Sequence, residues 1–212
     1  GCGQRWRGCM DTTICFLTIG DRNWASSRLR SYNTAKIIPG ATVVQWGKPG
    51  QQIPEGYGLY VWMKTTHIET MEQIRHDGGK NIIEVCDPSW WWQPQICRDM
   101  DRLSDLIIAA STPAADDYMQ WSGRDHDTVR VIPDRLDLSA YPIRHGEHHR
   151  ADPVRFVWYG MATNRIGIFA ALANLERLAC NGVPVELTVV DNVPETLLEI
   201  TVKCPIYHVR WS

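Results

Sequence analysis

Two charged side chains come directly after apolar runs that have the composition of buried strands. Lys64 follows GLYVWM (58–63), and Asp87 ends NIIEVCD (81–87). A lysine ammonium can bind a phosphate or an acceptor oxygen, and a carboxylate can accept hydrogen bonds from hydroxyl groups or act as a base. An ordinary surface lysine and a simple Asp-Pro turn are the structural alternatives. We take Lys64 and Asp87 as the candidate catalytic residues.

A second polar group stands where an apolar run at 14–20 gives way to a helical pattern at 26–38. The amide groups of a helix N-terminus, together with a guanidinium, suit a diphosphate or a polar acceptor. A serine that only caps the helix, with arginines on a solvated face, is the alternative. The candidate binding residues of this group are Ser26, Ser27, Arg28 and Arg30.

Three consecutive tryptophans, Trp90, Trp91 and Trp92, follow Asp87 closely. Because consecutive side chains cannot all face one core, at least one ring is expected to be accessible. An accessible ring can stack on a sugar or contact an amphipathic molecule, whereas partial burial under the next helix is the alternative. Trp90 is included among the candidate binding residues.

The strand-like run VRVI (129–132) leads directly into charged residues, among them Arg135 and Asp137. Charged groups that follow the carboxyl end of a strand can line a ligand crevice. An Arg–Asp pair that only holds a hinge is the alternative. Both residues are candidates for binding.

A second strand-to-helix turn follows PVRFVWYG (153–160). Gly160 allows close approach of the backbone, and Asn164 can cap a following helix whose N-terminus would face phosphate groups. Gly160, Asn164 and Arg165 are therefore candidate binding residues as well.

These residues need a scaffold, and the alternation of short apolar runs with longer helical patterns predicts an α/β fold with a parallel sheet. Strands are expected at 14–20, 41–46, 58–63, 81–87, 105–111 and 129–132, and helices at 26–38, 66–77, 95–103 and 113–121. Such a doubly wound, Rossmann-like sheet binds ligands at the carboxyl ends of its strands. The loops at 20–27, 63–66, 86–94, 111–113 and 133–137 should therefore share one rim.

The pattern changes after residue 133, which predicts a domain boundary. We expect a Rossmann-like domain over 1–133, a linker over 134–153 and the first βαβ portion of a second Rossmann-like domain over 154–212. The linker histidines His145, His148 and His149 have no rigid element beneath them, so we expect them to be solvated and not to bind a metal. About 60 residues are too few for a complete second domain at roughly 30 residues per βαβ unit. We expect the chain to be cut short.

Composition excludes several classes of function. A formal net charge of -2 gives no electrostatic reason to expect nucleic acid. No apolar run approaches the roughly 18 residues of a transmembrane helix, and the N-terminus has no signal-peptide core. Seven cysteines without a CxxC pair favour reduced thiols in a cytoplasmic protein. Kinase-type, zincin and hydrolase functions have no motif to support them.

Several segments, in this order, resemble the two-domain glycosyltransferases of the GT-B fold, in particular those that transfer from nucleotide sugars with retention. The resemblance covers nearly the whole chain, and it depends on the order of motifs that are weak individually. Asp134 and Arg135 replace the usual Asn-Gly of the segment where the domains meet, and Asp137 is kept. The segments are ASSRLR (25–30), VWMK (61–64), IIEVCDPSW (82–90), LSDLIIAAST (103–112), VIPDRLDLSAYP (131–142), WYGMATNRIG (158–167) and HVRWS (208–212).

This resemblance implies transfer of a sugar from a nucleotide-sugar donor to an acceptor, which could be a glycan, a lipid-linked sugar or another molecule. The first domain would hold the acceptor and the second the donor, in one crevice between them. Neither a metal nor another cofactor is implied, and peripheral contact with a membrane is compatible with it. The family's acidic pair for the donor would lie beyond residue 212, so activity is expected to be incomplete.

Two alternatives stay open at this point. One is a sugar-nucleotide epimerase of the same architecture, which needs carboxylates and a histidine that converge in a cleft. The other is a non-catalytic Rossmann-like binding protein, which is favoured if Lys64 and Asp87 point away from any pocket.

Overall fold

The chain folds as two α/β units. The computed structural model describes residues 13–48, 50–134, 153–161, 166–192 and 203–210, and the chain divides into Gly1–Ile143 and Arg144–Ser212. The first unit contains a six-stranded parallel sheet and the second a smaller, three-stranded parallel sheet. The predicted α/β, Rossmann-like fold class is confirmed. The predicted domain limits at 133 and 154 stay predictions, because they adjoin residues outside the described ranges.

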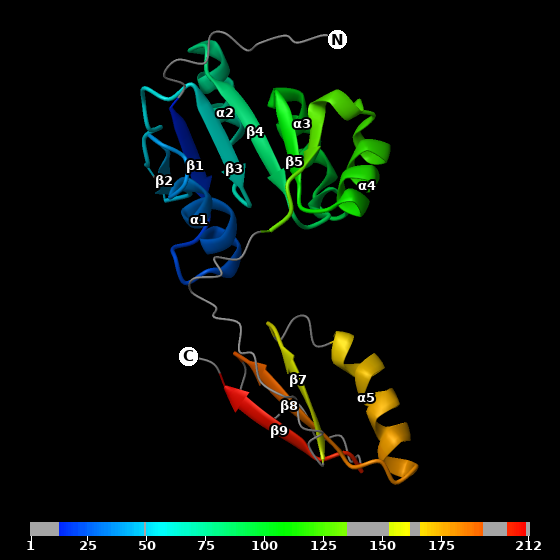
Figure 1. Ribbon diagram of the computed structural model, residues 1–212. Helices are drawn as coiled ribbons and strands as arrows, with labels where there is room; N and C mark the ends of the chain where they lie inside the picture. Colours follow the sequence, from blue (N-terminus) through cyan, green and yellow to red (C-terminus); the bar gives the residue numbers. More distant parts are fainter. Residues whose placement is uncertain (1–12, 49, 135–152, 162–165, 193–202, 211–212) are drawn as a thin grey trace, which may run out of the picture. The chain divides into compact units, whose positions relative to one another are not determined.

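The sheet of the first unit has the strand order β2-β1-β3-β4-β5-β6, with every neighbouring pair parallel (Figure 1). Its strands are rich in β-branched, aromatic and aliphatic residues, which suit a sheet covered on both faces. Each strand lies within one of the six apolar runs predicted as strands, apart from Lys80 at the start of β4. The strands are β1 (Ile14–Thr18), β2 (Thr42–Gln45), β3 (Leu59–Met63), β4 (Lys80–Val85), β5 (Leu106–Ala109) and β6 (Val129–Val131).

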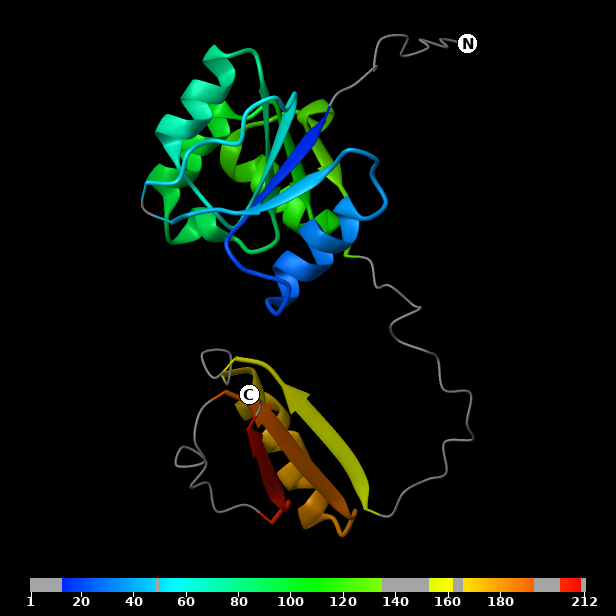
Figure 2. The ribbon, with the colours of Figure 1, turned by 90° about the vertical axis from the view of Figure 1, so that its left-hand side faces the viewer.

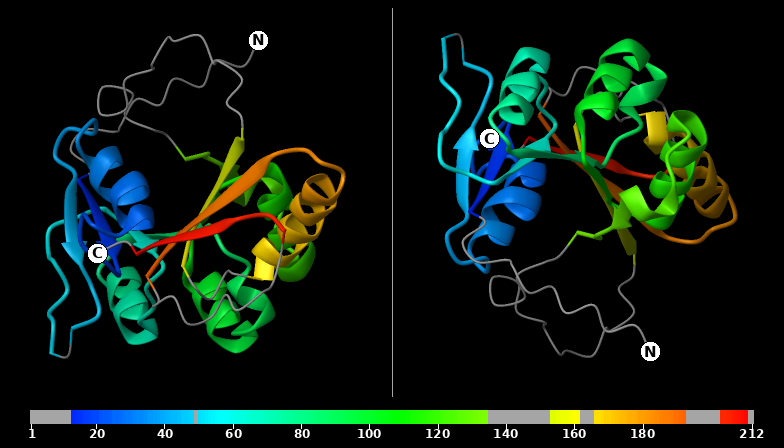
Figure 3. Two further views of the ribbon diagram at one scale, coloured as in Figure 1. Left: turned by 90° about the horizontal axis from the view of Figure 1, so that it is seen from below. Right: turned by 90° about the horizontal axis from the view of Figure 1, so that it is seen from above.

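Helices lie on both faces of this sheet (Figure 3). The π-helical η1 (Ser27–Tyr32) and the short α1 (Asn33–Ala35) that continues it lie on one face. On the other face lie α2 (Ile68–His76), α3 (Pro94–Leu103) and α4 (Thr112–Ser122). Two 3-10 turns, η2 (Ser89–Trp91) and η3 (His126–Thr128), complete the unit.

Local sequence explains where the helix α4 begins and ends. Ser111 caps its start, since its side chain accepts a hydrogen bond from the Ala114 amide. Gly123 ends it in the left-handed conformation, with φ of 77°, where a glycine has no Cβ to clash.

The main core lies between the sheet and α2, α3 and α4, and Asn81 is the polar residue at its centre. Asn81 is fully buried, and its Oδ1 accepts a hydrogen bond from Trp62 Nε1 at 2.9 Å. Its Nδ2 donates to the carbonyls of Met71 at 2.9 Å and Leu103 at 3.3 Å. One side chain therefore joins β3, β4 and two helices, and its polar atoms are all satisfied.

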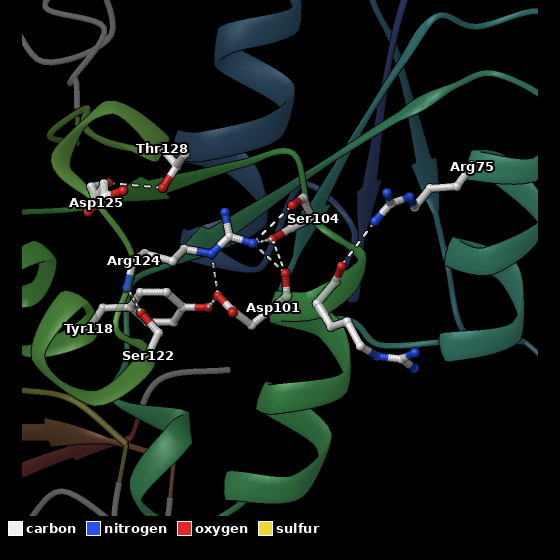
Figure 4. A network of polar contacts seen from close by, with 9 residues as sticks. Arg75, Asp101, Ser104, Tyr118, Ser122, Arg124, Asp125 and Thr128 are labelled. Atoms are coloured by element: carbon white, nitrogen blue, oxygen red, sulfur yellow. Dashed lines mark hydrogen bonds and ion pairs between the residues drawn. The ribbon is translucent and has the colours of Figure 1, made fainter.

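A second polar network holds α3 against the segment that follows α4 (Figure 4). Arg124 Nε donates to Asp101 Oδ1 at 2.5 Å, and its Nη2 donates to the carbonyl of Ser104 at 2.9 Å. Tyr118 Oη donates to the same carboxylate at 2.7 Å. Burial and the charge of Asp101 raise the pKa of Tyr118, so the phenol keeps its proton as a donor. The guanidinium thus satisfies carbonyls at the C-terminal end of α3.

The described residues of the second unit form a three-stranded sheet and one helix. Its strands β7 (Val154–Tyr159), β8 (Val185–Asp191) and β9 (Ile206–Arg210) lie in that order, and α5 (Ile166–Cys180) packs on one face (Figure 2). Its core contains Ile168, Leu172, Leu175, Val185, Leu187, Val189 and Cys204. None of the helices in the described ranges combines the length and hydropathy that crossing a bilayer requires.

Replacing Asn81 by leucine should destabilise the first unit. Asn81→Leu leaves the Trp62 indole N–H and the Leu103 carbonyl without this partner, at about 1–3 kcal/mol for each unsatisfied group, and it also removes a hydrogen bond to the Met71 carbonyl. We expect a loss of roughly 3 kcal/mol or more in the free energy of unfolding, measured by urea denaturation followed through tryptophan fluorescence. Asn23→Leu, at an exposed position of the same unit, is the control and should change stability by less than about 0.5 kcal/mol. A loss for Asn81→Leu as small as that of the control would contradict the role given to Asn81.

Cys15 should make the first unit sensitive to alkali. Burial raises the pKa of its thiol from the ordinary 9.0 to about 12, so above pH 9 the unfolded chain releases a proton that the folded chain retains. Stability is therefore lost as the pH rises through this window, by up to about 1.4 kcal/mol per pH unit. Urea denaturation at several pH values between about 9.5 and 11 gives the free energy of unfolding as a function of pH. In Cys15→Ala this free energy should fall less steeply with pH than in the wild type, by that amount. Cys180→Ala removes an exposed thiol and serves as the control; equal slopes in all three proteins would refute the assignment.

Candidate functional site

The strand order places the topological switch point of the sheet between β1 and β3. The chain leaves β1 through η1 on one face and leaves β3 through α2 on the other face (Figure 3). Where two such connections diverge, the loops separate and leave room for a ligand. The segments that follow β1, β3 and β4 are those that carry most of the predicted site residues of this unit.

Lys64 and Asp87 are brought together at this edge. Lys64 Nζ lies 2.5 Å from Asp87 Oδ2, and the two side chains are 35% and 54% exposed. Burial opposes the charge of Lys64, but the hydrogen bond that it donates to Asp87 and the charges of Cys86 and Asp87 outweigh this effect, so the lysine pKa is raised. The ammonium is therefore a stable cation that solvent can still reach.

The backbone of Lys64 is strained. Its φ is 52°, and among the described residues it is the sole non-glycine residue with a positive φ. A left-handed conformation costs a non-glycine residue about 1–3 kcal/mol and is found most often at functional sites. The strain directs the side chain toward Asp87 at the end of the neighbouring strand.

The ion pair borders a cavity of about 220 Å³. Thr65 and Ser89 supply hydroxyl groups to its wall, and Ile96 and Trp92 supply apolar surface. Two thiols, Cys86 and Cys97, also line it, and burial is the main cause that raises the pKa of each. The cavity thus combines one cation, Lys64, with two acidic residues, Glu84 and Asp87, neutral donors and several aromatic rings.

The three tryptophans divide between core and surface. Trp90 is 2% exposed; its ring packs edge-on against Tyr118 at 5.1 Å, and its Nε1 donates to Asp117 at 3.2 Å. Trp91 and Trp92 are 69% and 60% exposed. Trp90 thus forms part of the cavity wall from within the core, whereas the accessible ring that lines the cavity is Trp92.

The polar residues at the start of η1 have partners within the chain. Ser27 is buried, and its Oγ accepts hydrogen bonds from Thr18 Oγ1 at 2.8 Å and from the Gly20 amide at 3.2 Å. Arg28 Nη1 donates to the carbonyls of Arg22 and Asn23. Ser26 precedes η1 without a side-chain capping bond. These residues shape the turn after β1, and their binding of a ligand stays a prediction.

Arg30 forms a buried cluster with Glu84 and Asp134 on the η1 face of the sheet. Its Nε pairs with Glu84, its Nη1 pairs with Asp134, and its Nη2 donates to the carbonyl of Ile132 at 3.2 Å. The side chains of Arg30 and Glu84 are 4% and 7% exposed. The guanidinium thus ties η1 to β4 and to the end of β6.

The remaining predicted site residues belong to the junction and to the second unit. Arg135, Asp137, Asn164 and Arg165 lie outside the described residues. Gly160 follows β7, and its amide donates to the carbonyl of Val190 at 3.1 Å. A Cβ at this position would lie 2.9 Å from the Trp158 ring, so the close packing of that ring requires the glycine.

Three residues of the site region were missed by the sequence hypothesis: Glu84, Asp134 and Trp92. Glu84 could have been identified from the sequence, because a carboxylate within the apolar run NIIEV is expected to be buried and to need a buried partner. Asp134 stood beside a predicted junction, but its pairing with Arg30 spans 104 positions of the chain. Nothing in three identical residues indicates which of them faces solvent.

Comparison with known proteins gives no family: the sequence matches no protein-family model and no curated protein. Nor do three or more metal-ligating side chains gather anywhere within the described residues. Any function is therefore inferred from the residues and geometry above.

The Arg30–Glu84 pair should show strong coupling in a double-mutant cycle. Arg30→Met leaves the Glu84 carboxylate buried without its cation, which costs about 3–5 kcal/mol. Glu84→Leu should also be destabilising, and the double variant should lose less stability than the two single losses added together. Urea denaturation of the four proteins measures the coupling. Additive losses would show that the two side chains do not interact.

Proposed function

We propose that the chain is a glycosyltransferase of the GT-B type, which moves a sugar from a nucleotide-sugar donor to an acceptor such as a glycan or a lipid-linked sugar. The observation that carries the proposal is the Lys64–Asp87 pair on a cavity at the carboxyl edge of the sheet. The ordered motifs from ASSRLR to HVRWS support the same family. The tandem of two α/β units, each with a parallel sheet, agrees with it.

Lys64 would act as a fixed cation. Since its pKa is raised, it keeps its proton at neutral pH and suits electrostatic stabilisation, not proton abstraction. A cation held beside a cavity stabilises negative charge, such as that of a departing diphosphate or of a phosphorylated acceptor. No metal is needed for that role.

Asp87 would orient hydroxyl groups of the acceptor or take up a proton from the attacking one. It lies next to Lys64 and faces the same cavity, so a hydroxyl bound there can reach both charges. The exposed ring of Trp92 offers an apolar face on which a sugar can stack. Gly160, Asn164 and Arg165 would bind the phosphates of the donor, as the resemblance implies.

The geometry favours this function over the two alternatives. A non-catalytic binding protein was favoured if Lys64 and Asp87 pointed away from any pocket, and both line the cavity. An epimerase needs a histidine among converging carboxylates, and no histidine lines this cavity among the described residues.

Removing the Lys64 cation should abolish most of the activity. We expect Lys64→Met and Asp87→Asn to lower the release of nucleoside diphosphate from UDP- or GDP-linked sugars by roughly 100-fold or more, because a preorganised charge at the reacting centre is lost. The assay uses UDP-glucose, UDP-N-acetylglucosamine and GDP-mannose, each with and without sugar and lipid-linked acceptors.

The chain contains a matched control at the opposite edge of the sheet. Lys80 at the start of β4 pairs with Asp105 at 3.0 Å, so Lys80→Met removes the same charge from the same kind of pair and should leave the rate within about twofold. Equal losses in both variants would remove the special role of Lys64. Absence of turnover with every donor, together with no heat of UDP or GDP binding in calorimetry, would overturn the proposal.

A further inference from the structure

An apolar groove of about 590 Å³ runs along the η1 face of the six-stranded sheet. One wall comes from the helix, with Leu29 and Ile37, and the floor comes from successive strands, with Phe16, Val61 and Ile108. On this face η1 and α1 pack near β1 and β3, while α2, α3 and α4 lie on the other face (Figure 3). Among the described residues no helix covers β4 and β5 here, so within this part of the chain the groove is open.

One end of the groove is polar and incompletely satisfied. Arg30, Glu84 and Asp134 line it there. The donors of Arg30 go to Glu84, to Asp134 and to the carbonyl of Ile132. Glu84 Oε2 is buried and has no hydrogen-bond partner among the described residues. A bound molecule that donates a hydrogen bond would satisfy this oxygen.

The charge at this end specifies the kind of donor. Two carboxylates face one guanidinium, so this cluster has an excess of one negative charge. Lys36 also lines the groove, but it is not an ion-pair partner of the cluster. An anionic group would be repelled, whereas a hydroxyl or an ammonium would both satisfy Glu84 and match the charge.

We propose that this groove binds a linear amphipathic molecule with a saturated or isoprenoid chain and a hydrogen-bond-donating head, either hydroxyl or ammonium. Its volume falls within the roughly 300–1,000 Å³ of small-molecule sites, which are mostly apolar with a few placed polar groups. The hydrocarbon chain of the bound molecule would lie against the strands, between the helix and Ile108. Its head group would donate a hydrogen bond to Glu84 Oε2. This inference does not depend on the proposed glycosyl transfer: the Lys64–Asp87 cavity borders α3 on the opposite face, and Glu84 is the residue that lines both cavities.

The isoleucines of the first unit provide reporters on both faces of the same sheet. The test is a titration of protein labelled at the isoleucine δ1 methyl groups, followed by ¹H–¹³C NMR, with 1-decanol, decylamine and decanoate as probes below their aggregation limits. Saturable shifts are expected with 1-decanol or decylamine at the groove reporters, and little change at the residues on the other face. The groove reporters are Ile14, Ile37, Ile82, Ile108 and Ile132, and the controls are Ile68, Ile74, Ile83 and Ile107.

The three probes separate the role of the head group from that of the chain. Decanoate has the same chain with an acceptor head of negative charge, so its affinity should be at least tenfold lower than that of the better of the other two. The comparison of 1-decanol with decylamine then distinguishes the hydroxyl from the ammonium head.

A matched pair of variants tests the location. Ile37 is 80% exposed and lines the groove, so Ile37→Glu should fold normally. The variant should weaken binding at least tenfold, because it places a charge against the hydrocarbon chain of the bound molecule. Ile19 is 43% exposed and does not line the groove, so Ile19→Glu should keep the affinity within about twofold.

Three results would overturn the inference. One is the absence of saturable shifts at the groove methyl groups with any of the probes. Another is shifts of equal size on both faces, which indicate non-specific uptake of amphiphile. The last is contact of the groove isoleucines with another segment of the protein in the ligand-free state, detected as nuclear Overhauser effects from methyl groups, because a protein segment would then be the occupant.

Discussion

Parallel pairing of six strands is the constraint on which the rest of the first unit depends. Parallel neighbours need a crossover connection, and from β3 onward each step along the sheet brings a helix onto a face. Three such connections place α2, α3 and α4 over one face, and the first connection, through η1, lies on the other. The carboxyl ends of all strands then meet at one edge. The Lys64–Asp87 pair exists because two strands adjacent in the sheet, β3 and β4, both end there.

This arrangement also explains the division of polar groups inside the unit. Along β4, every second side chain points to the face covered by α2, α3 and α4 and lies in the main core. Asn81 is one of these, and its hydrogen-bond partners belong to neighbouring strands and helices. A side chain one position away faces η1, as Ile82 does, and Glu84 follows on that same side. Because side chains alternate between the two faces of β4, Asn81 lies in the core with its hydrogen bonds satisfied. Glu84 lies on the other face, in the charged cluster beside the groove.

Much of the fold could be predicted from sequence because its strands are short apolar runs bounded by turn residues and its helices carry apolar residues at helical spacing. The order of the strands could not be predicted in this way. No local feature of residues 42–45 indicates that β2 pairs with β1 on the side opposite to β3. The π-helical form of η1 was equally hidden, because SRLRSY has no feature that distinguishes it from an ordinary helix.

The meeting of Lys64 and Asp87 at the edge where their strands end could be predicted from the general rule for parallel sheets, and their role in a site stays a prediction. The arginines and serines of 26–30 could not be assigned in the same way, because their partners come from distant positions such as Glu84 and Asp134. An arginine at this position suggested a site for an anionic ligand. In the structure, the guanidinium of Arg30 pairs instead with two carboxylates of the same protein. A long-range ion pair of this kind leaves no periodic trace in the sequence.

The edge strand β7 has a consequence for the behaviour of the protein in concentrated solution. It lies at one border of the smaller sheet, and Val154, Phe156, Val157 and Tyr159 are between 39% and 74% exposed on it. The border strands β2 and β6 of the larger sheet have only four and three residues, which limits their pairing with another molecule, whereas β7 offers six. An accessible, apolar and fairly long border strand is a template for intermolecular strand addition. Among the described border strands, β7 is therefore the one most open to such addition, and charged residues introduced along it would oppose this association.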